Sequence, residues 1–168
     1  MEYYDDDWEL SPANAHPLAR KRLIQPFLWQ MADDASPLGN DTGADTLVYF
    51  RYWRQGNRFL SPNRFISRLL SDWQIADADW EMLDSQKLKR RLKKQWTHII
   101  IRDEVAIAVA FAQIVLEGKL DAEVKKKALL AIQRQLLDTM IDFRNWSYKD
   151  EMVERFTAMQ DILSQDWS

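Results

Sequence analysis

The stretch DEVAIAVAFAQIVL, residues 103–116, decides the fold of this chain. Between residues 105 and 116 only Gln113 is polar, while Asp103 and Glu104 open the stretch and Gly118 follows it. Charged residues at the start and a glycine just past the end are typical of an α-helix. A helix that is apolar on every side cannot lie on a surface. The stretch therefore predicts a buried central helix over residues 103–117.

The segments around this helix show helical rather than strand periodicity. Leu88, Leu92, Trp96 and Ile99 are spaced by four, four and three, which predicts an amphipathic helix from about residue 85 with Trp96 toward the core. A run of β-branched residues at 97–102, THIIIR, leaves a short strand as a minor alternative. Further helices are predicted over about 17–24, 41–56, 62–73, 121–143 and 147–163. The expected fold is all-α, a single-domain helical bundle of about six to eight helices around the central helix.

Turn residues divide the chain. All five prolines and three of the four glycines lie before residue 63, so short helices and loops are expected there and long helices afterwards. Residues 1–10 form an acidic, aromatic arm, and residues 11–168 form one helical domain, since no repeat or low-complexity linker separates them.

Composition excludes several classes of protein. The chain has no cysteine, which excludes disulfides, thiolate metal sites and a cysteine nucleophile. The net charge of −3 argues against a dedicated nucleic-acid binder. Arg102, Asp103 and Glu104 interrupt the longest apolar run before it reaches the roughly 20 residues of a membrane span. We expect a soluble cytoplasmic protein without a membrane partner.

Sequence motifs for catalysis and cofactors are missing. There is no glycine-rich phosphate loop, no Walker lysine and no Gly-x-Ser-x-Gly elbow. The two histidines, His16 and His98, stand far apart and outside any zinc-binding spacing. We therefore predict no catalytic residue, no metal and no cofactor, and we favour a protein that is not an enzyme.

The stretch FRYWRQGNRF, residues 50–59, alternates aromatic residues with arginines. Tyr, Trp and Arg dominate the energetics of protein–protein interfaces. The acidic arm offers a second charged surface, suited to a basic partner. The sequence thus predicts a protein-binding module with an unidentified protein partner, and the candidate interaction residues are Tyr52, Trp53, Arg54, Arg58, Asp5, Asp6 and Asp7.

A first alternative is a metal- or ligand-binding protein, or an enzyme, that uses clustered carboxylates. The candidates are Asp33, Asp34, Asp41 and Asp45, together with His16. Helix capping explains the same residues without a ligand. An Asn or Asp oxygen accepts amide hydrogens at the start of a helix, and the helix dipole stabilises carboxylates there. In that interpretation the segment is a helix-cap motif of Asn40, Asp41, Gly43 and Asp45.

A second alternative is association with nucleic acid through the basic run at residues 87–94. Lys87, Arg90, Arg91 and Lys94 could follow phosphates on one helix. A solvated helix face explains the same charges, and Trp96, the obvious stacking residue, is expected in the core.

Four strings in the first third resemble a known family. They are SPANAHPLA at residues 11–19, FLW at 27–29, SPLGNDTGAD at 36–45 and FRYWR at 50–54. Together they resemble the YfeS-like family of uncharacterised bacterial proteins over roughly residues 9–65. The resemblance implies bacterial origin and a cytoplasmic location, but no activity, cofactor or catalytic residue. A looser similarity to small helical immunity proteins implies that the protein partner could be a toxin.

Overall fold

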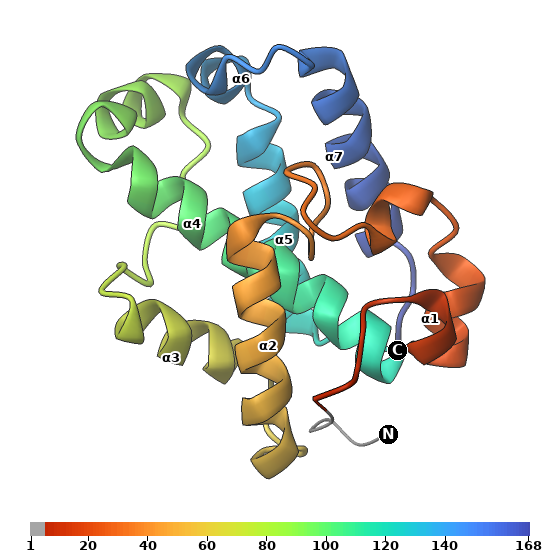
Figure 1. Cartoon of the computed structure of the whole chain (residues 1–168). Helices are drawn as coiled ribbons and strands as arrows, with labels where there is room; N and C mark the ends of the chain where they lie inside the picture. The colour runs from red at the N-terminus through yellow and green to blue at the C-terminus, as the bar shows by residue number, and fades with distance from the viewer. Residues whose placement is uncertain (1–5) are drawn as a thin grey trace.

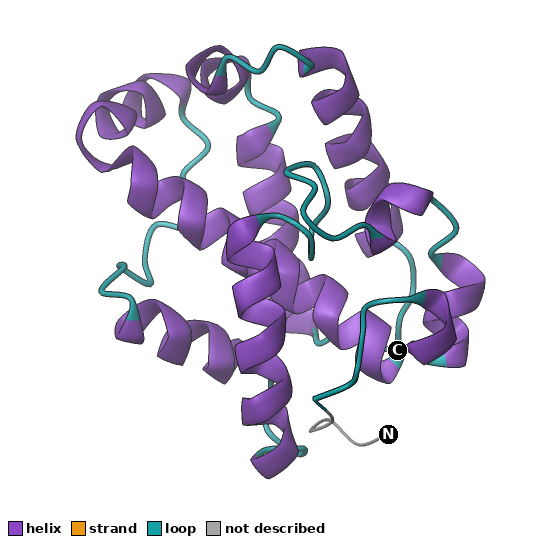
Figure 2. Cartoon of the chain, viewed as in Figure 1, coloured by secondary structure: helices purple, strands orange, loops and turns teal. Residues whose placement is uncertain are grey.

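The computed structural model describes residues 6–168, and in this range the chain is helical without strands (Figures 1 and 2). Seven α-helices and two short 3-10 helices follow one another, which confirms the all-α bundle of six to eight helices. Asp5, one of the candidate interaction residues, lies outside the described residues. The elements are η1 (Pro12–Asn14), α1 (Pro17–Arg22), η2 (Pro26–Trp29), α2 (Asp41–Gly56), α3 (Asn63–Asp72), α4 (Ser85–Glu117), α5 (Ala122–Gln135), α6 (Asp138–Arg144) and α7 (Lys149–Leu163).

Helix α4 forms the centre of the molecule. It runs diagonally through the bundle, with α2 in front of it and α5 behind it (Figure 1). Every residue from Val105 to Leu116 is buried, including Gln113, whose side-chain oxygen accepts the backbone N–H of Asp121 at 2.8 Å. Gly118 ends the helix with φ of +65°. The expected buried central helix is therefore present.

The central helix is longer than its apolar stretch. The sequence predicted two helices, one ending near residue 99 and one starting at residue 103. In the structure the break lies earlier, at a kink at Gln95 within α4, and the helix after this kink runs through residues 97–102 into the apolar stretch. The charged pair Arg102 and Asp103 does not begin a helix but lies in its middle, where the Asp103 carboxylate contacts Arg134 of α5 at 2.8 Å. An internal partner allows a charge to sit on a buried face, so the helix has no reason to end there. The short strand considered as an alternative at residues 97–102 is wrong, because these residues are helical in α4.

The expected burial of Trp96 is also wrong. Leu88, Leu92 and Ile99 are buried as predicted, but the Trp96 side chain is 50% exposed. Gln95, immediately before it, has non-helical φ and ψ of −134° and 25° inside α4. This irregular residue rotates the following turn, which takes Trp96 out of the apolar stripe.

The predicted helix over residues 121–143 is divided into α5 and α6. Leu137 is extended, with φ of −65° and ψ of 138°, and α6 starts at the next residue. The break turns Leu137 and Met140 onto a second apolar cluster, which includes Leu88 and Ile100 of α4. A straight continuation of α5 would leave this part of α4 uncovered.

Both ends of the described chain are fixed against the body. Trp167 is buried, and its indole N–H donates to the carbonyl of Ile162 at 2.8 Å. The Arg51 guanidinium lies 4.5 Å from the centroid of the Trp8 ring, so the C-terminal part of the predicted arm contacts α2. Among the helices of residues 6–168, none has the length and hydropathy that spanning a membrane would require.

Candidate functional site: an aromatic groove between α2 and α3

The loop before α2 fixes where this helix begins. The Asn40 side-chain oxygen accepts the backbone N–H of Gly43 at 2.7 Å, so Asn40 caps the helix rather than Asp41. A Cβ on Gly43 would come within 2.1 Å of the carbonyl oxygen of Pro37, which excludes any larger residue at this position. Asp41 and Asp45 are exposed in the first turns of α2, where the helix dipole favours carboxylates. The motif thus sets the position of α2 and of the aromatic residues that it carries.

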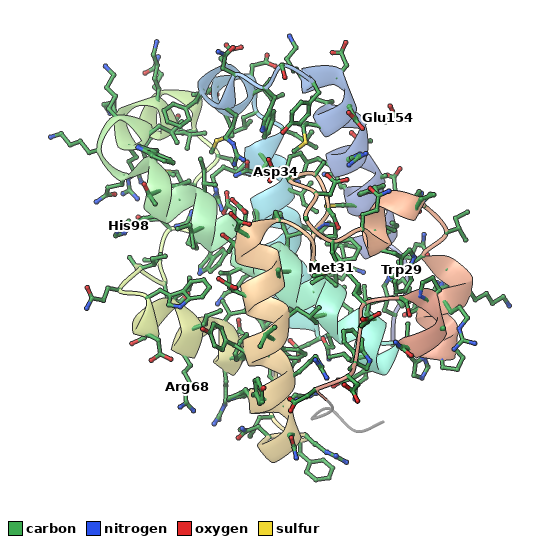
Figure 3. The ribbon with its side chains drawn as sticks, in the orientation of Figure 1. Trp29, Met31, Asp34, Arg68, His98 and Glu154 are labelled. Atoms are coloured by element: carbon green, nitrogen blue, oxygen red, sulfur yellow. The ribbon has the colours of Figure 1, made fainter. Side chains whose placement is uncertain are left out.

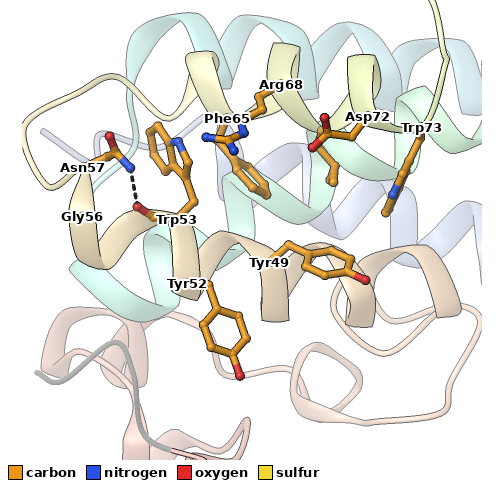
Figure 4. A pocket seen from close by; sticks show the side chains of 10 residues that line it. Tyr49, Tyr52, Trp53, Gly56, Asn57, Phe65, Arg68, Asp72 and Trp73 are labelled. Atoms are coloured by element: carbon orange, nitrogen blue, oxygen red, sulfur yellow. Dashed lines mark hydrogen bonds between the residues drawn. The ribbon is translucent and has the colours of Figure 1, made fainter.

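A groove of about 550 Å³ separates the C-terminal half of α2 from α3 (Figure 4). Its floor is aromatic: the Trp53 and Phe65 rings lie 5.5 Å apart between centroids, and Phe50 lies beneath them at 5.3 Å from Phe65. Tyr49 meets Trp73 edge to face at 6.4 Å. The lining residues are Tyr49, Tyr52, Trp53, Gly56, Asn57, Phe65, Arg68, Leu69, Asp72 and Trp73.

The rim of the groove exposes large side chains to solvent. Tyr49 and Tyr52, which both line the groove, are 49% and 47% exposed. Single exposed apolar side chains are ordinary on a protein surface, but a contiguous group of them marks an interaction site. Rigid aromatic rings at the rim of a preformed groove provide such a group.

The groove region is basic although the whole chain is acidic. Residues 49–72 contain five arginines and a single acid, Asp72, whereas the chain carries a net charge of −3. Arg68 and Asp72 both line the groove, and neither forms an ion pair within residues 6–168. The surface around the groove therefore attracts acidic groups.

Arg54 supports the groove from inside. The sequence placed Arg54 on the interaction surface, which is wrong, because its side chain is buried. Its guanidinium binds the Glu117 carboxylate through two nitrogens, at 2.7 and 2.8 Å, and donates to the carbonyls of Asn57 and Leu60. Burial would raise the pKa of Glu117, but the hydrogen bonds and charge of Arg54 hold that pKa below its ordinary value. Arg54 thus ties the loop between α2 and α3 to the end of α4.

The other candidate interaction residues are distributed as follows. Tyr52 and Trp53 line the groove, while Arg58 is exposed in the loop that follows α2. Asp6 and Asp7 are exposed near the start of the described chain. The sequence missed Arg68 and Asp72, which stand four residues apart on the polar face of α3. Their i, i+4 spacing was visible, but nothing in the sequence showed that this face borders α2.

The structure does not bring the clustered aspartates together with His16. The Asp33 carboxylate pairs with Arg155 at 3.0 Å and accepts the backbone N–H of Ala35. Asp41 and Asp45 are on α2, and Asp34 is on the preceding loop, in the upper centre of Figure 3. His16 caps α1 by accepting the N–H of Leu18 at 3.1 Å. Within residues 6–168, no three carboxylates or histidines are grouped in a way that could hold a metal ion.

Asp34 has one notable neighbour, Glu104 of α4, which lines the same small cavity. Burial raises the pKa of Glu104 from 4.5 to about 7, and the charges of Asp103 and Asp34 add to the effect. Arg144 and a hydrogen bond with Thr42 oppose it. The folded protein therefore keeps a proton on Glu104 at a pH where the unfolded chain has lost it.

This shift predicts a pH-dependent effect of Glu104→Gln. Between pH 4.5 and about 7 the contribution of Glu104 to the stability of the wild-type protein falls as the pH rises, because folding then opposes ionisation of Glu104. We expect the variant to gain about 3 kcal/mol relative to wild type between about pH 4 and pH 8. Urea denaturation of both proteins at the two pH values measures this difference. A difference that does not change with pH would show that Glu104 ionises normally.

The basic run of α4 lies on the surface. Lys87, Arg90 and Lys94 are exposed, and Arg91 forms an ion pair with Asp79. Trp96 is exposed as well, but Gln95 separates it from the regular helix that carries the lysines and arginines. Nucleic-acid binding by this run stays a prediction.

Comparisons with known proteins agree with the resemblance noted above. The chain is 26% identical over 163 residues to a protein of Escherichia coli (strain K12) described as "Uncharacterized protein YfeS", and the match covers 93% of this chain and 67% of that protein. The resemblance to the YfeS-like family is confirmed. It also extends well beyond residues 9–65, so the second half of the chain, including α4 to α7, shares in it. No family model matches the sequence, and no solved structure matches it.

Proposed function

We propose that this YfeS-like chain is a non-enzymatic, cytoplasmic protein-binding module whose binding site is the groove between α2 and α3. The observation that carries the proposal is the set of half-exposed aromatic rings, Tyr49 and Tyr52, on a preformed groove beside Arg68, which has no ion-pair partner among residues 6–168. Tyr, Trp and Arg are the residues that contribute most to protein–protein binding energy. The cysteine-free composition supports the cytoplasmic part of the proposal.

The charge of the groove region indicates which kind of partner would fit. Arg54 is neutralised by Glu117, whereas Arg64 and Arg68 form no ion pair within residues 6–168, and Asp72 is the single acid of the segment 49–72. A partner segment that presents apolar side chains flanked by carboxylates would match both the aromatic floor and the arginines. That the partner is a toxin, as in immunity proteins, stays a prediction from the sequence.

Groove variants test the proposal by affinity capture. The tagged protein is used to recover its partner from a lysate of its native cell after nuclease treatment. We expect Tyr52→Ala and Arg68→Glu each to weaken binding about 30-fold, because interface hot spots contribute about 2 kcal/mol or more. Binding should also weaken as salt is raised, since the arginines attract an acidic surface.

Matched control variants are available on other surfaces. Tyr148, at the start of α7, is 39% exposed, and Lys93 is exposed on α4. Tyr148→Ala and Lys93→Glu therefore remove an aromatic ring and reverse a charge without touching the groove. If these controls weaken binding as much as the groove variants do, the groove is not the binding site.

A further inference from the structure

A second aromatic pocket lies between α4 and α6 and shares no residue with the groove. It encloses about 360 Å³, and its walls include Trp96 and Phe143, which are 50% and 41% exposed. Their ring centroids are 6.2 Å apart and the rings are inclined by 45°. Ile100 and Ile101 complete the apolar part of the lining.

A local break in α4 brings Trp96 into this pocket. The regular spacing of Leu88, Leu92 and Trp96 would bury all three side chains, but the non-helical Gln95 turns Trp96 outward. Leaving a tryptophan half exposed loses hydrophobic stabilisation that the regular helix would have gained. Irregular residues inside helices are often found at functional sites. The break therefore has a consequence for binding as well as for packing.

A carboxylate stands beside the two rings. Glu104 lines the pocket eight residues after Trp96, on the same side of α4, with the largely buried Ile100 between them. The Arg144 guanidinium comes no closer to the Glu104 carboxylate than 4.0 Å, which is beyond hydrogen-bond length. Arg144 also lines the pocket, and its guanidinium lies over the Trp146 ring at 4.8 Å. When Glu104 is ionised, Arg144 therefore neutralises its negative charge only in part.

We propose that this pocket binds an alkylated ammonium group, with Trp96 and Phe143 contacting its methyl groups and Glu104 balancing its charge. Aromatic faces attract cations, and paired rings are a common means of binding quaternary ammonium ions. The apolar lining favours a methylated cation over a primary ammonium, because the latter would lose strong hydration. Burial raises the pKa of Glu104 although Arg144 lies 4.0 Å away, which agrees with a carboxylate whose charge Arg144 balances only in part.

The test is an NMR titration of the full chain with choline chloride, which follows the Trp96 indole N–H signal. The neutral isostere 3,3-dimethyl-1-butanol has the same shape without the charge. We expect choline to bind at least about tenfold more tightly than the isostere at about pH 8. Trp96→Ala and Glu104→Gln should each weaken choline binding about tenfold.

The pH dependence provides an independent check. The groups that face Glu104 are Arg144 of α6, Asp34 of the loop before α2, Asp103 of α4 and Thr42 of α2. Choline binding should strengthen as the pH rises through about 7, because Glu104 then becomes ionised. The Glu104→Gln variant should lose this dependence.

Two results would overturn the proposal. One is equal binding of choline and its neutral isostere, which would make the pocket merely apolar. The other is the absence of a saturable Trp96 shift at millimolar choline. A peptide that carries trimethyllysine separates two sources of the same group: tighter binding than choline would support a protein-borne cation, and binding no tighter than choline would support a free small cation.

Discussion

Asp103→Ala is expected to lower the free energy of unfolding by about 3–5 kcal/mol, since breaking a buried ion pair leaves an uncompensated charge. Asp103 and Arg134 are both fully buried. The Asp103 carboxylate accepts three contacts from the Arg134 guanidinium, at 2.8 to 3.2 Å, and one from Gln135 at 3.0 Å. Arg134 also donates to the carbonyls of Trp80 and Met82, so a change in its position would break these two hydrogen bonds to the loop before α4.

Chemical denaturation measures this effect. Asp161→Ala, an exposed aspartate on α7, is the matched control and should change stability by about 0.5 kcal/mol at most. The double variant Asp103→Leu with Arg134→Met should recover part of the loss, because no buried charge of the pair then lacks its partner, although the carbonyls of Trp80 and Met82 lose their donor. An Asp103→Ala protein within about 1 kcal/mol of wild type would contradict the role assigned to the pair.

The second large effect is expected at Arg54, the buried support of the groove. Arg54→Ala should cost about 3–4 kcal/mol, since it removes the two-nitrogen contact with the nearly buried Glu117 carboxylate and the donor of two loop carbonyls. Arg54→Lys should recover little, because an ammonium cannot replace the two-nitrogen contact and the contacts with Asn57 and Leu60 together. Denaturation curves of both variants, with the exposed Arg64→Ala as control, measure these differences.

The Arg54 variants also distinguish a structural role in the groove from direct contact with a protein partner. Because Arg54 is buried, it contacts no partner directly, and any loss of partner binding in Arg54→Ala should accompany loss of stability. The groove variants Tyr52→Ala and Arg68→Glu should instead lose binding while they keep their stability within about 0.5 kcal/mol. If Arg54→Ala were fully stable, the loop between α2 and α3 would not depend on this contact.

Local patterns in the sequence predicted the helices well. The apolar stretch at 105–116 predicted the buried part of α4, and Asn40 and Gly43 predicted the start of α2, because capping and periodicity depend only on neighbouring residues. The break at Gln95 was not predictable in the same way. It involves neither proline nor glycine, which are the usual sequence signals of a helix break.

The buried ion pairs were missed for a similar reason. Asp103 and Arg134 are 31 residues apart, and Arg54 and Glu117 are 63 apart, so no helical spacing connects them. Each charge on its own therefore looked like a surface residue. The groove was missed likewise, because the sequence predicted α2 and α3 as separate helices and did not show that they lie side by side. Tyr52 was identified as an interaction residue, but Arg68 was not, because only the packed structure places α3 beside α2.

The most direct test of the binding site is photo-cross-linking in the native cell. A photoreactive amino acid in place of Tyr52 samples the groove, and the same amino acid in place of Tyr148 samples a comparably exposed surface elsewhere. If the groove binds a protein partner, position 52 should yield one discrete cross-linked product that disappears with Arg68→Glu, and position 148 should yield none. A product that forms equally at both positions, or that persists with Arg68→Glu, would contradict the assignment of the groove as the binding site.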